Sequence, residues 1–147
     1  MEKRQKYIGA IDQGTTSTRF ILFNEKGEIT ASHQLEHKQI FPKPGWVEHN
    51  PMEIWDNTVI VIRKTLENSG ITADQIAGIG ITNQRETVVA WNPKTGKPYC
   101  NAIVWQDLRG KPFIDELIEE LGVDGLRDKT GLTLSPYFSG SKIRWML

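Results

Sequence analysis

A polar run, Asp12–Arg19 (DQGTTSTR), stands between two short apolar stretches near the start of the chain. The flanks, Tyr7–Ile11 and Phe20–Phe23, are typical of strands, so the run predicts a tight hairpin turn. A turn built from Gly, Thr and Ser presents backbone N–H groups and hydroxyls, which are the donors that a phosphate group needs. Asp12, at the end of the first strand, is placed to hold a hydrated magnesium ion. The run therefore predicts one segment that offers both partners of a metal–nucleotide complex.

An ordinary hairpin is the alternative interpretation of this run. Hairpin turns are commonly rich in Gly, Thr, Ser and Asp because these residues suit turn backbones. The chain has no Gly-x-x-x-x-Gly-Lys-Ser/Thr run, which excludes a Walker-type phosphate loop. It also lacks a Gly-x-Gly-x-x-Gly run, which argues against a dinucleotide-binding fold.

Length and charge narrow the classes of protein. The 147 residues suffice for one domain with a real core. Eighteen basic residues balance eighteen acidic ones and no basic tract occurs, so nucleic acid is not expected as a partner. The single cysteine, Cys100, excludes an internal disulfide and fits a cytoplasmic location. We expect neither a signal peptide nor a membrane-spanning segment.

The first part of the chain predicts three antiparallel strands followed by a crossover helix. Strands are expected over 6–12, 18–24 and 28–35. Because short turns join them, these strands should pair antiparallel. After a proline-rich loop, Asn50-Pro51-Met52-Glu53 carries the signals of a helix start, and Gly70 those of a helix end.

The second part predicts further strands and a helix. The run 76–81 is apolar without alternation, which indicates a central strand buried on both faces. Strands over 88–91 and 102–105 and a helix over 112–121 follow, giving an α/β fold with a mixed sheet. Residues 139–147 open like a helix with Ser139 as its N-cap and end on apolar residues. We therefore expect the chain to be the N-terminal part of a longer protein.

A second group of residues suits a small polyol. Arg85 donates hydrogen bonds to hydroxyl oxygens and Glu86 accepts from hydroxyl hydrogens, at what should be the carboxyl end of a strand. Trp105 would cover the apolar C–H side of the ligand, and Tyr137 would add a hydroxyl. The alternatives are an exposed charge pair and a core tryptophan. Neighbours on a regular strand point to opposite faces, so Arg85 and Glu86 reach one ligand only if the chain leaves the strand there.

His33 and His37 lie four residues apart, and on one strand both would point the same way. A metal pair is one interpretation, but no Cys or carboxylate completes the set in sequence. We expect a solvated strand face instead.

Taken together, five ordered segments resemble the glycerol kinases of the FGGY carbohydrate kinase family over nearly the whole chain. The segment Asp12–Arg19 is common to many sugar kinases, whereas Ile79–Thr87 and Pro136–Gly140 are more specific to glycerol kinases. One departure follows Trp105, where Gln106–Gly110 has one basic residue in place of the pair frequent in the family. The segments are Asp12–Arg19 (DQGTTSTR), Pro42–His49 (PKPGWVEH), Ile79–Thr87 (IGITNQRET), Ala102–Gln106 (AIVWQ) and Pro136–Gly140 (PYFSG).

The resemblance implies a ribonuclease-H-like, actin-like ATPase fold, with residues 1–147 forming the N-terminal kinase domain and a second domain absent from this chain. It implies that Thr15, Thr16 and Ser17 contact the nucleotide phosphates with Arg19 nearby, and that Asp12 acts on magnesium through water. The implied glycerol-binding residues are Arg85, Glu86, Trp105 and Tyr137.

The implied activity is the ATP-dependent phosphorylation of glycerol to glycerol 3-phosphate, with ATP and Mg²⁺ as cofactors. The catalytic aspartate of the family would lie beyond residue 147, so this chain alone is expected to be inactive. A homo-oligomer, dimer or tetramer, is expected of the whole protein. A kinase for another small polyol or sugar, or a non-catalytic nucleotide-binding scaffold, are the alternatives.

Overall fold

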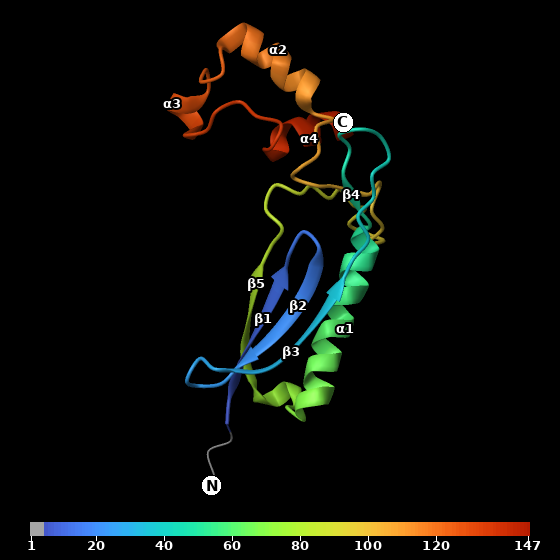
Figure 1. Ribbon diagram of the computed structural model, residues 1–147, viewed down its shortest axis with the longest axis vertical. Helices are drawn as coiled ribbons and strands as arrows, with labels where there is room; N and C mark the ends of the chain where they lie inside the picture. The colour runs from blue at the N-terminus through green and yellow to red at the C-terminus, as the bar shows by residue number, and fades with distance from the viewer. Residues whose placement is uncertain (1–4) are drawn as a thin grey trace. The chain divides into compact units, whose positions relative to one another are not determined.

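The computed structural model describes residues 5–147, which form two compact units (Figure 1). The first unit holds residues 5–38 and 50–84, and the second holds residues 39–49 and 85–147. The chain therefore passes from one unit to the other three times.

A four-stranded mixed sheet forms the first unit, in the order β3-β2-β1-β5. The strands are β1 (Tyr7–Gln13), β2 (Ser17–Phe23), β3 (Ile29–Glu36) and β5 (Ile76–Thr82). The first three pair antiparallel because short turns connect them, and β5 pairs parallel with β1 after a helical crossover. The predicted strand arrangement is confirmed here, and Gly27, in the turn between β2 and β3, has a left-handed conformation, with φ of 78°.

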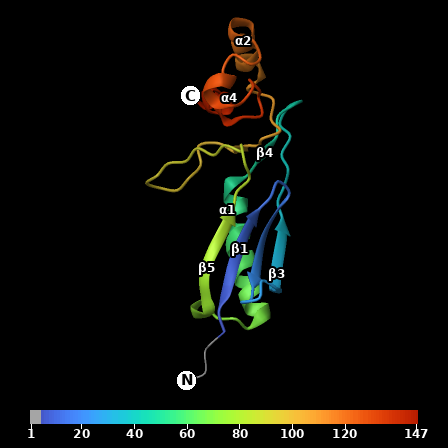
Figure 2. The ribbon, with the colours of Figure 1, turned by 90° about the vertical axis from the view of Figure 1, so that its left-hand side faces the viewer.

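The crossover helix α1 (Pro51–Ser69) begins and ends where its sequence signals lie. The side chain of Asn50 accepts a hydrogen bond from the Met52 N–H at 2.9 Å, and Pro51 occupies the first turn. Gly70 closes the helix in the left-handed region, with φ of 67°. Figures 1 and 2 show α1 running along one face of the sheet, where it packs on β2 and β3. A short 3₁₀ turn (Ala73–Gln75) then leads into β5.

The core of this unit lies between α1 and β2. Phe20, Leu22 and Val61 are buried at its centre. Gly9 is required on the neighbouring strand, because a Cβ there would lie 2.6 Å from the Phe20 ring. Seven partly buried side chains complete the layer, and they are Ile11, Ala31, Leu35, Ile62, Leu66, Ile71 and Ile76.

The prediction that the strand over 76–81 is buried on both faces is wrong for the described residues. β5 is an edge of the sheet, and Ile79 and Ile81 are 53% and 73% exposed. α1 packs mainly on β2 and β3, and Ile76 at the start of β5 is where this strand joins the core layer.

The second unit contains a two-stranded ladder and three helices. β4 (Glu48–His49) pairs antiparallel with β6 (Ala102–Ile103). The helices are α2 (Lys111–Leu121), α3 (Arg127–Thr130) and α4 (Ser139–Met146). The buried apolar side chains of this unit are Ala102, Ile103, Val104 and Ile114.

One strand prediction is wrong in this unit, and a second strand is shorter than predicted. No strand covers 88–91 among the described residues, because Val88 forms only a single bridge to Ile103 and Trp91 one to Pro98. The strand predicted over 102–105 is limited to the two residues of β6. These apolar runs lack a continuous neighbouring edge, and a strand needs one for its backbone hydrogen bonds.

A buried ion cluster holds the second unit together. Arg109 donates to Asp107 at 2.8 Å and to Glu48 at 2.7 Å, and the side chains of Arg109 and Asp107 are almost fully buried. The Arg109 guanidinium also lies over the rings of Trp46 and Trp145, 3.8 Å and 4.6 Å from their centroids. Although burial opposes the charge, the hydrogen bonds that Arg109 donates to the two carboxylates raise its pKa.

Across residues 5–147, the helices include none with both the length and the apolar character needed to cross a lipid bilayer.

Candidate functional site

The turn between β1 and β2 is closed by its own backbone. The Gly14 N–H donates to the Ser17 carbonyl at 2.9 Å, which leaves Thr15 and Thr16 at the tip. The Ser17 hydroxyl accepts a hydrogen bond from Gln34 at 2.9 Å, so its own hydrogen stays available to an acceptor. The predicted hairpin turn is therefore confirmed.

Two side chains from distant segments fix the carbonyl groups of this turn. Gln84 Nε2 donates to the Gly14 carbonyl at 2.9 Å. The backbone N–H of His37 donates to the Thr16 carbonyl at 3.1 Å, and its ring Nε2 lies 2.9 Å from the Thr15 carbonyl. Because a carbonyl only accepts, Nε2 carries the ring proton here. His37 is 6% exposed, so the expectation of a solvated face is wrong at this residue.

Asp12 and Arg19 are cross-strand neighbours beside the turn. The two residues lie directly opposite each other on β1 and β2, and Arg19 donates to Asp12 Oδ2 at 2.7 Å. Both side chains remain more than a third exposed, at 37% and 44%. The pair therefore presents a carboxylate and a guanidinium to solvent at the end of β1.

Arg85 and Glu86 lie in a turn after β5, which ends at Thr82. Glu86 has φ of 62°, and it is the one non-glycine residue with positive φ among the described residues. This conformation costs of order 1–3 kcal/mol and persists only where surrounding contacts impose it. The chain has left the strand here, so the condition for both side chains to reach one ligand is met.

The contacts that hold Glu86 come from the start of α4. Glu86 Oε2 accepts from the Ser139 N–H and from the Ser139 hydroxyl, each at 2.8 Å. Ser139 is the first residue of the helix, and Phe138 occupies the N-cap position without a side-chain cap bond. The prediction of Ser139 as the N-cap is therefore wrong, because a carboxylate 53 residues away satisfies the start of the helix.

Trp105 and Tyr137 meet edge to face. Their ring centroids lie 5.9 Å apart at 67°, and Tyr137 makes a second edge contact with Phe138 at 5.2 Å. The Trp105 N–H donates to Thr87 Oγ1 at 3.2 Å. Glu86, through Ser139, and the two rings thus belong to one cluster in the second unit. Among the described residues, the exposed side chain of Arg85 makes no hydrogen bond or ion pair.

Two residues whose roles were not predicted from the sequence support these groups. His37 fixes the turn, and Lys142, fully buried on α4, donates hydrogen bonds to the segment that carries Tyr137. Neither has a sequence signal of its own, because both act on backbone carbonyls rather than on a recognisable partner side chain.

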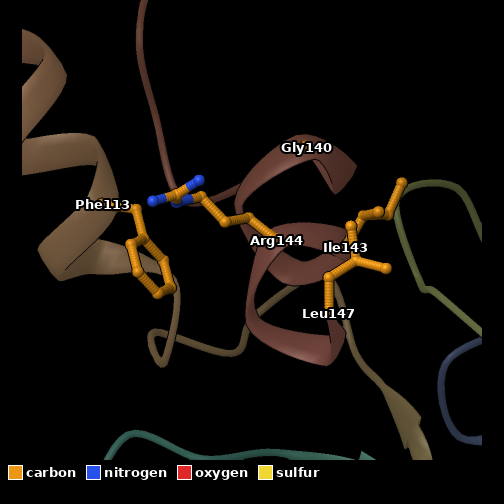
Figure 3. Close-up of a pocket in the computed structure, with 5 residues that line it drawn as sticks. All are labelled: Phe113, Gly140, Ile143, Arg144 and Leu147. Atoms are coloured by element: carbon orange, nitrogen blue, oxygen red, sulfur yellow. The ribbon is translucent and has the colours of Figure 1, made fainter.

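A hollow of about 500 Å³ opens between α2 and α4 (Figure 3). In Figure 3, the Arg144 side chain extends toward the Phe113 ring, and its guanidinium lies 5.1 Å from the ring centroid. An apolar cavity of about 320 Å³ adjoins it and shares Phe113, Gly140 and Arg144. None of the predicted ligand-binding residues lines either space.

Comparison with known proteins gives curated relatives of high identity. The glycerol kinases of Leifsonia xyli subsp. xyli and Beijerinckia indica subsp. indica are each 58% identical to this chain over 142 residues. These alignments cover 97% of this chain and 28% of each relative. The chain therefore spans about a quarter of the length of the curated relatives it matches.

Solved structures of sugar kinases have the same fold. Glycerol kinase of Plasmodium falciparum, solved with ADP, is 38% identical with a TM-score of 0.88, over 97% of this chain and 28% of that one. Gluconate kinase of Lactobacillus acidophilus is 25% identical with a TM-score of 0.86, over the same shares of the two chains. Together with the mixed sheet, these likenesses confirm the predicted ribonuclease-H-like, actin-like ATPase fold.

The family comparison covers almost every described residue. Residues 7–147 match the model of the N-terminal domain of the FGGY family of carbohydrate kinases. The match includes the β1–β2 turn, the Glu86 turn and the start of α4. This chain therefore belongs to the FGGY family of carbohydrate kinases.

Proposed function

We propose that this chain supplies the phosphate-binding turn and the glycerol-binding residues of an ATP-dependent glycerol kinase. The observation that carries the proposal is the cluster of Glu86, Trp105 and Tyr137, built around a strained turn. A nucleotide-binding scaffold has no use for a carboxylate, an indole and a phenol gathered in this way. The names of the 58% identical relatives support the same reaction and substrate.

Each member of the glycerol-binding set has a role that its chemistry suits. Among the described residues only Oε2 of Glu86 is bonded, so Oε1 can accept from a glycerol hydroxyl. The exposed guanidinium of Arg85 donates to hydroxyl oxygens. Trp105 packs on the carbon skeleton, and the Tyr137 hydroxyl adds one further polar contact.

The β1–β2 turn is proposed to bind the nucleotide phosphates. The hydroxyls of Thr15, Thr16 and Ser17 are donors at its tip, and Arg19 adds positive charge beside them. Because His37 and Gln84 already fix the carbonyl groups of the turn, its donors are oriented before ATP arrives.

Asp12 fits a magnesium ion bound through water. Its Oδ1 has no hydrogen bond among the described residues, and the carboxylate is exposed. Mg²⁺ is usually bound by one or two carboxylates, several waters and substrate phosphates. Among the described residues, no group of three or more His, Cys, Asp or Glu side chains could hold a metal ion, so the phosphates would supply part of the ligand set. When bound, the ion would neutralise charge on the phosphates.

In the proposed reaction a terminal glycerol oxygen attacks the γ-phosphorus of ATP. The bond from that phosphorus to the bridging oxygen breaks, ADP leaves, and the hydroxyl proton passes to a base that the family resemblance assigns beyond residue 147. The residues of this chain bind and orient the two substrates, which is the main source of catalysis in phosphoryl transfer. A cytoplasmic location and a homo-oligomeric state stay predictions.

The test is a coupled ADP-release assay on the whole protein that contains this chain. Glycerol, xylulose and gluconate are compared as acceptors at equal concentrations, and the product is identified by mass spectrometry. We expect glycerol 3-phosphate as the main product, with magnesium required.

Three outcomes would contradict the proposal. Faster turnover of xylulose or gluconate would indicate a kinase for a larger sugar. Binding of ATP without any transfer would indicate a scaffold. Equal ADP release with and without glycerol would indicate an ATPase.

A further inference from the structure

Lys142 is a fully buried cation that the proposed reaction does not use. Its Nζ donates to three successive carbonyl groups, those of Pro136 at 2.9 Å, Tyr137 at 2.6 Å and Phe138 at 3.3 Å. Lys142 lies in the first turn of α4, so it reaches back to the segment that enters its own helix.

Three carbonyl groups that converge on one point need a donor with three hydrogens. A lysine ammonium provides three N–H donors and no acceptor, and its charge strengthens each bond. A neutral apolar side chain of similar length would leave the three carbonyls without this partner, and the segment would then turn toward other donors. The ammonium therefore imposes the backbone conformation of residues 136–138.

The same segment carries two parts of the glycerol-binding cluster. Tyr137 presents its ring to Trp105, and the next residues place the Ser139 N–H and hydroxyl on Glu86. Lys142 itself touches neither ring and neither oxygen of Glu86 among the described contacts. It acts instead on the backbone of the segment that carries Tyr137 and leads to Ser139.

We propose that Lys142 is a positioning residue for glycerol, because its ammonium holds residues 136–138 so that Tyr137 and Glu86 keep their places in the binding set. This inference rests on the proposed function. In this proposal, Lys142 contacts neither glycerol nor ATP.

The first experiment measures glycerol affinity in the whole protein by calorimetry without ATP, together with the KM for glycerol and for ATP. For Lys142→Met we expect glycerol affinity to fall about tenfold or more, since charge-assisted hydrogen bonds are lost. The KM for ATP should change by less than about twofold, because Lys142 does not act on the residues proposed for ATP. Lys142→Arg keeps the charge and the donors, so it should recover part of the lost affinity. Lys129→Met, at an exposed lysine on α3, is the matched control and should bind glycerol as the wild type does.

The second experiment is a double-mutant cycle with Glu86→Gln. If Lys142 acts through the cluster, Lys142→Met should weaken glycerol binding much less in the Glu86→Gln background than in the wild type. If the two substitutions instead acted independently, their fold-losses in glycerol affinity would multiply in the double variant. Should Lys142→Met fail to fold, the cycle is run with Lys142→Gln, whose amide keeps two donors.

Three results would overturn the inference: unchanged glycerol affinity in a folded Lys142 variant, an equal loss of ATP affinity, or multiplicative effects in the cycle. A wild type that binds no glycerol would contradict the proposed function itself. A wild type that binds glycerol, paired with an unaffected Lys142 variant, would contradict only the role of Lys142.

Discussion

Arg85 and Glu86 are neighbours in the sequence but have different structural roles. Glu86 is held at φ of 62° by its two bonds to Ser139, so its position is fixed before any ligand binds. Arg85 is exposed and makes no hydrogen bond among the described residues. Its guanidinium therefore has all of its donors left for a ligand, and its loss should affect binding more than folding.

Arg85→Ala is accordingly predicted to lower kcat/KM for glycerol. A hydrogen bond to a charged group contributes about 1.5–3 kcal/mol, which corresponds to a loss of roughly 10- to 150-fold. Thermal unfolding should change little, because exposed side chains away from special contacts contribute little to stability. Steady-state kinetics on the whole protein checks this, with Arg63→Ala, an exposed arginine on α1, as the control. Equal effects of the two variants would contradict the assigned role of Arg85.

Lys142 also predicts a pH dependence of stability. Burial lowers the pKa of Lys142 from its ordinary 10.5, and the attraction of Glu86 and Asp107 opposes this only in part. The unfolded chain therefore holds the proton more tightly than the folded chain does between the folded pKa and 10.5. Over that window, the contribution of Lys142 to the free energy of unfolding should rise with pH, reach its full value above 10.5, and be lost as pH falls through the folded pKa.

The measurement compares wild type with Lys142→Met in denaturant titrations across this alkaline range. The difference in the free energy of unfolding, wild type minus variant, should increase with pH. A difference that falls with pH would mean that the carbonyl groups raise the pKa of Lys142 above that of the free side chain.

Among the elements, α1 and the three antiparallel strands could be predicted from sequence because their signals are local. Asn50, Pro51 and Gly70 set the ends of the helix within a few residues of themselves. The strand predicted over 88–91 failed, because an apolar run becomes a strand only beside a continuous partner. Ser139 failed for a related reason, since its donors serve a carboxylate 53 residues away. Sequence patterns identified the groups of the candidate site, whereas the long-range contacts that orient them required the structure.

The β1–β2 turn depends in the same way on an element distant in sequence. His37, just after β3, engages the carbonyls of Thr15 and Thr16 through its ring and its backbone. His37→Ala keeps the backbone bond and removes the ring bond, so the turn should become less ordered. We predict a several-fold increase in the KM for ATP, in line with the loss of one hydrogen bond of about 0.5–1.5 kcal/mol. The KM for glycerol should stay unchanged.

Kinetics with each substrate varied in turn checks this prediction. His33→Ala is the control, because it removes an imidazole from β3 and leaves the bonds of the turn intact. An equal rise in both KM values for His37→Ala would point to general unfolding rather than to the turn.

For the molecule as a whole, the two units divide the proposed substrates between them. The residues proposed for the phosphates and magnesium belong to the first unit, and those proposed for glycerol belong to the second. A variant in one unit should therefore change the KM of one substrate more than that of the other. No residue of either unit is proposed as the base that takes the hydroxyl proton.

This division predicts that residues 1–147, produced alone, do not phosphorylate glycerol at a useful rate. A positioned general base contributes typically 10²- to 10⁴-fold, so turnover should be about a hundredth of that of the whole protein or less. Closure that excludes water would also be incomplete, because the chain spans only 28% of its curated relatives. The coupled assay on both proteins, with circular dichroism to verify that the shorter chain is folded, measures the ratio. Turnover of the shorter chain near that of the whole protein would mean that an acidic group within residues 1–147 accepts the proton, and Asp12 and Glu86 would be the first candidates to substitute.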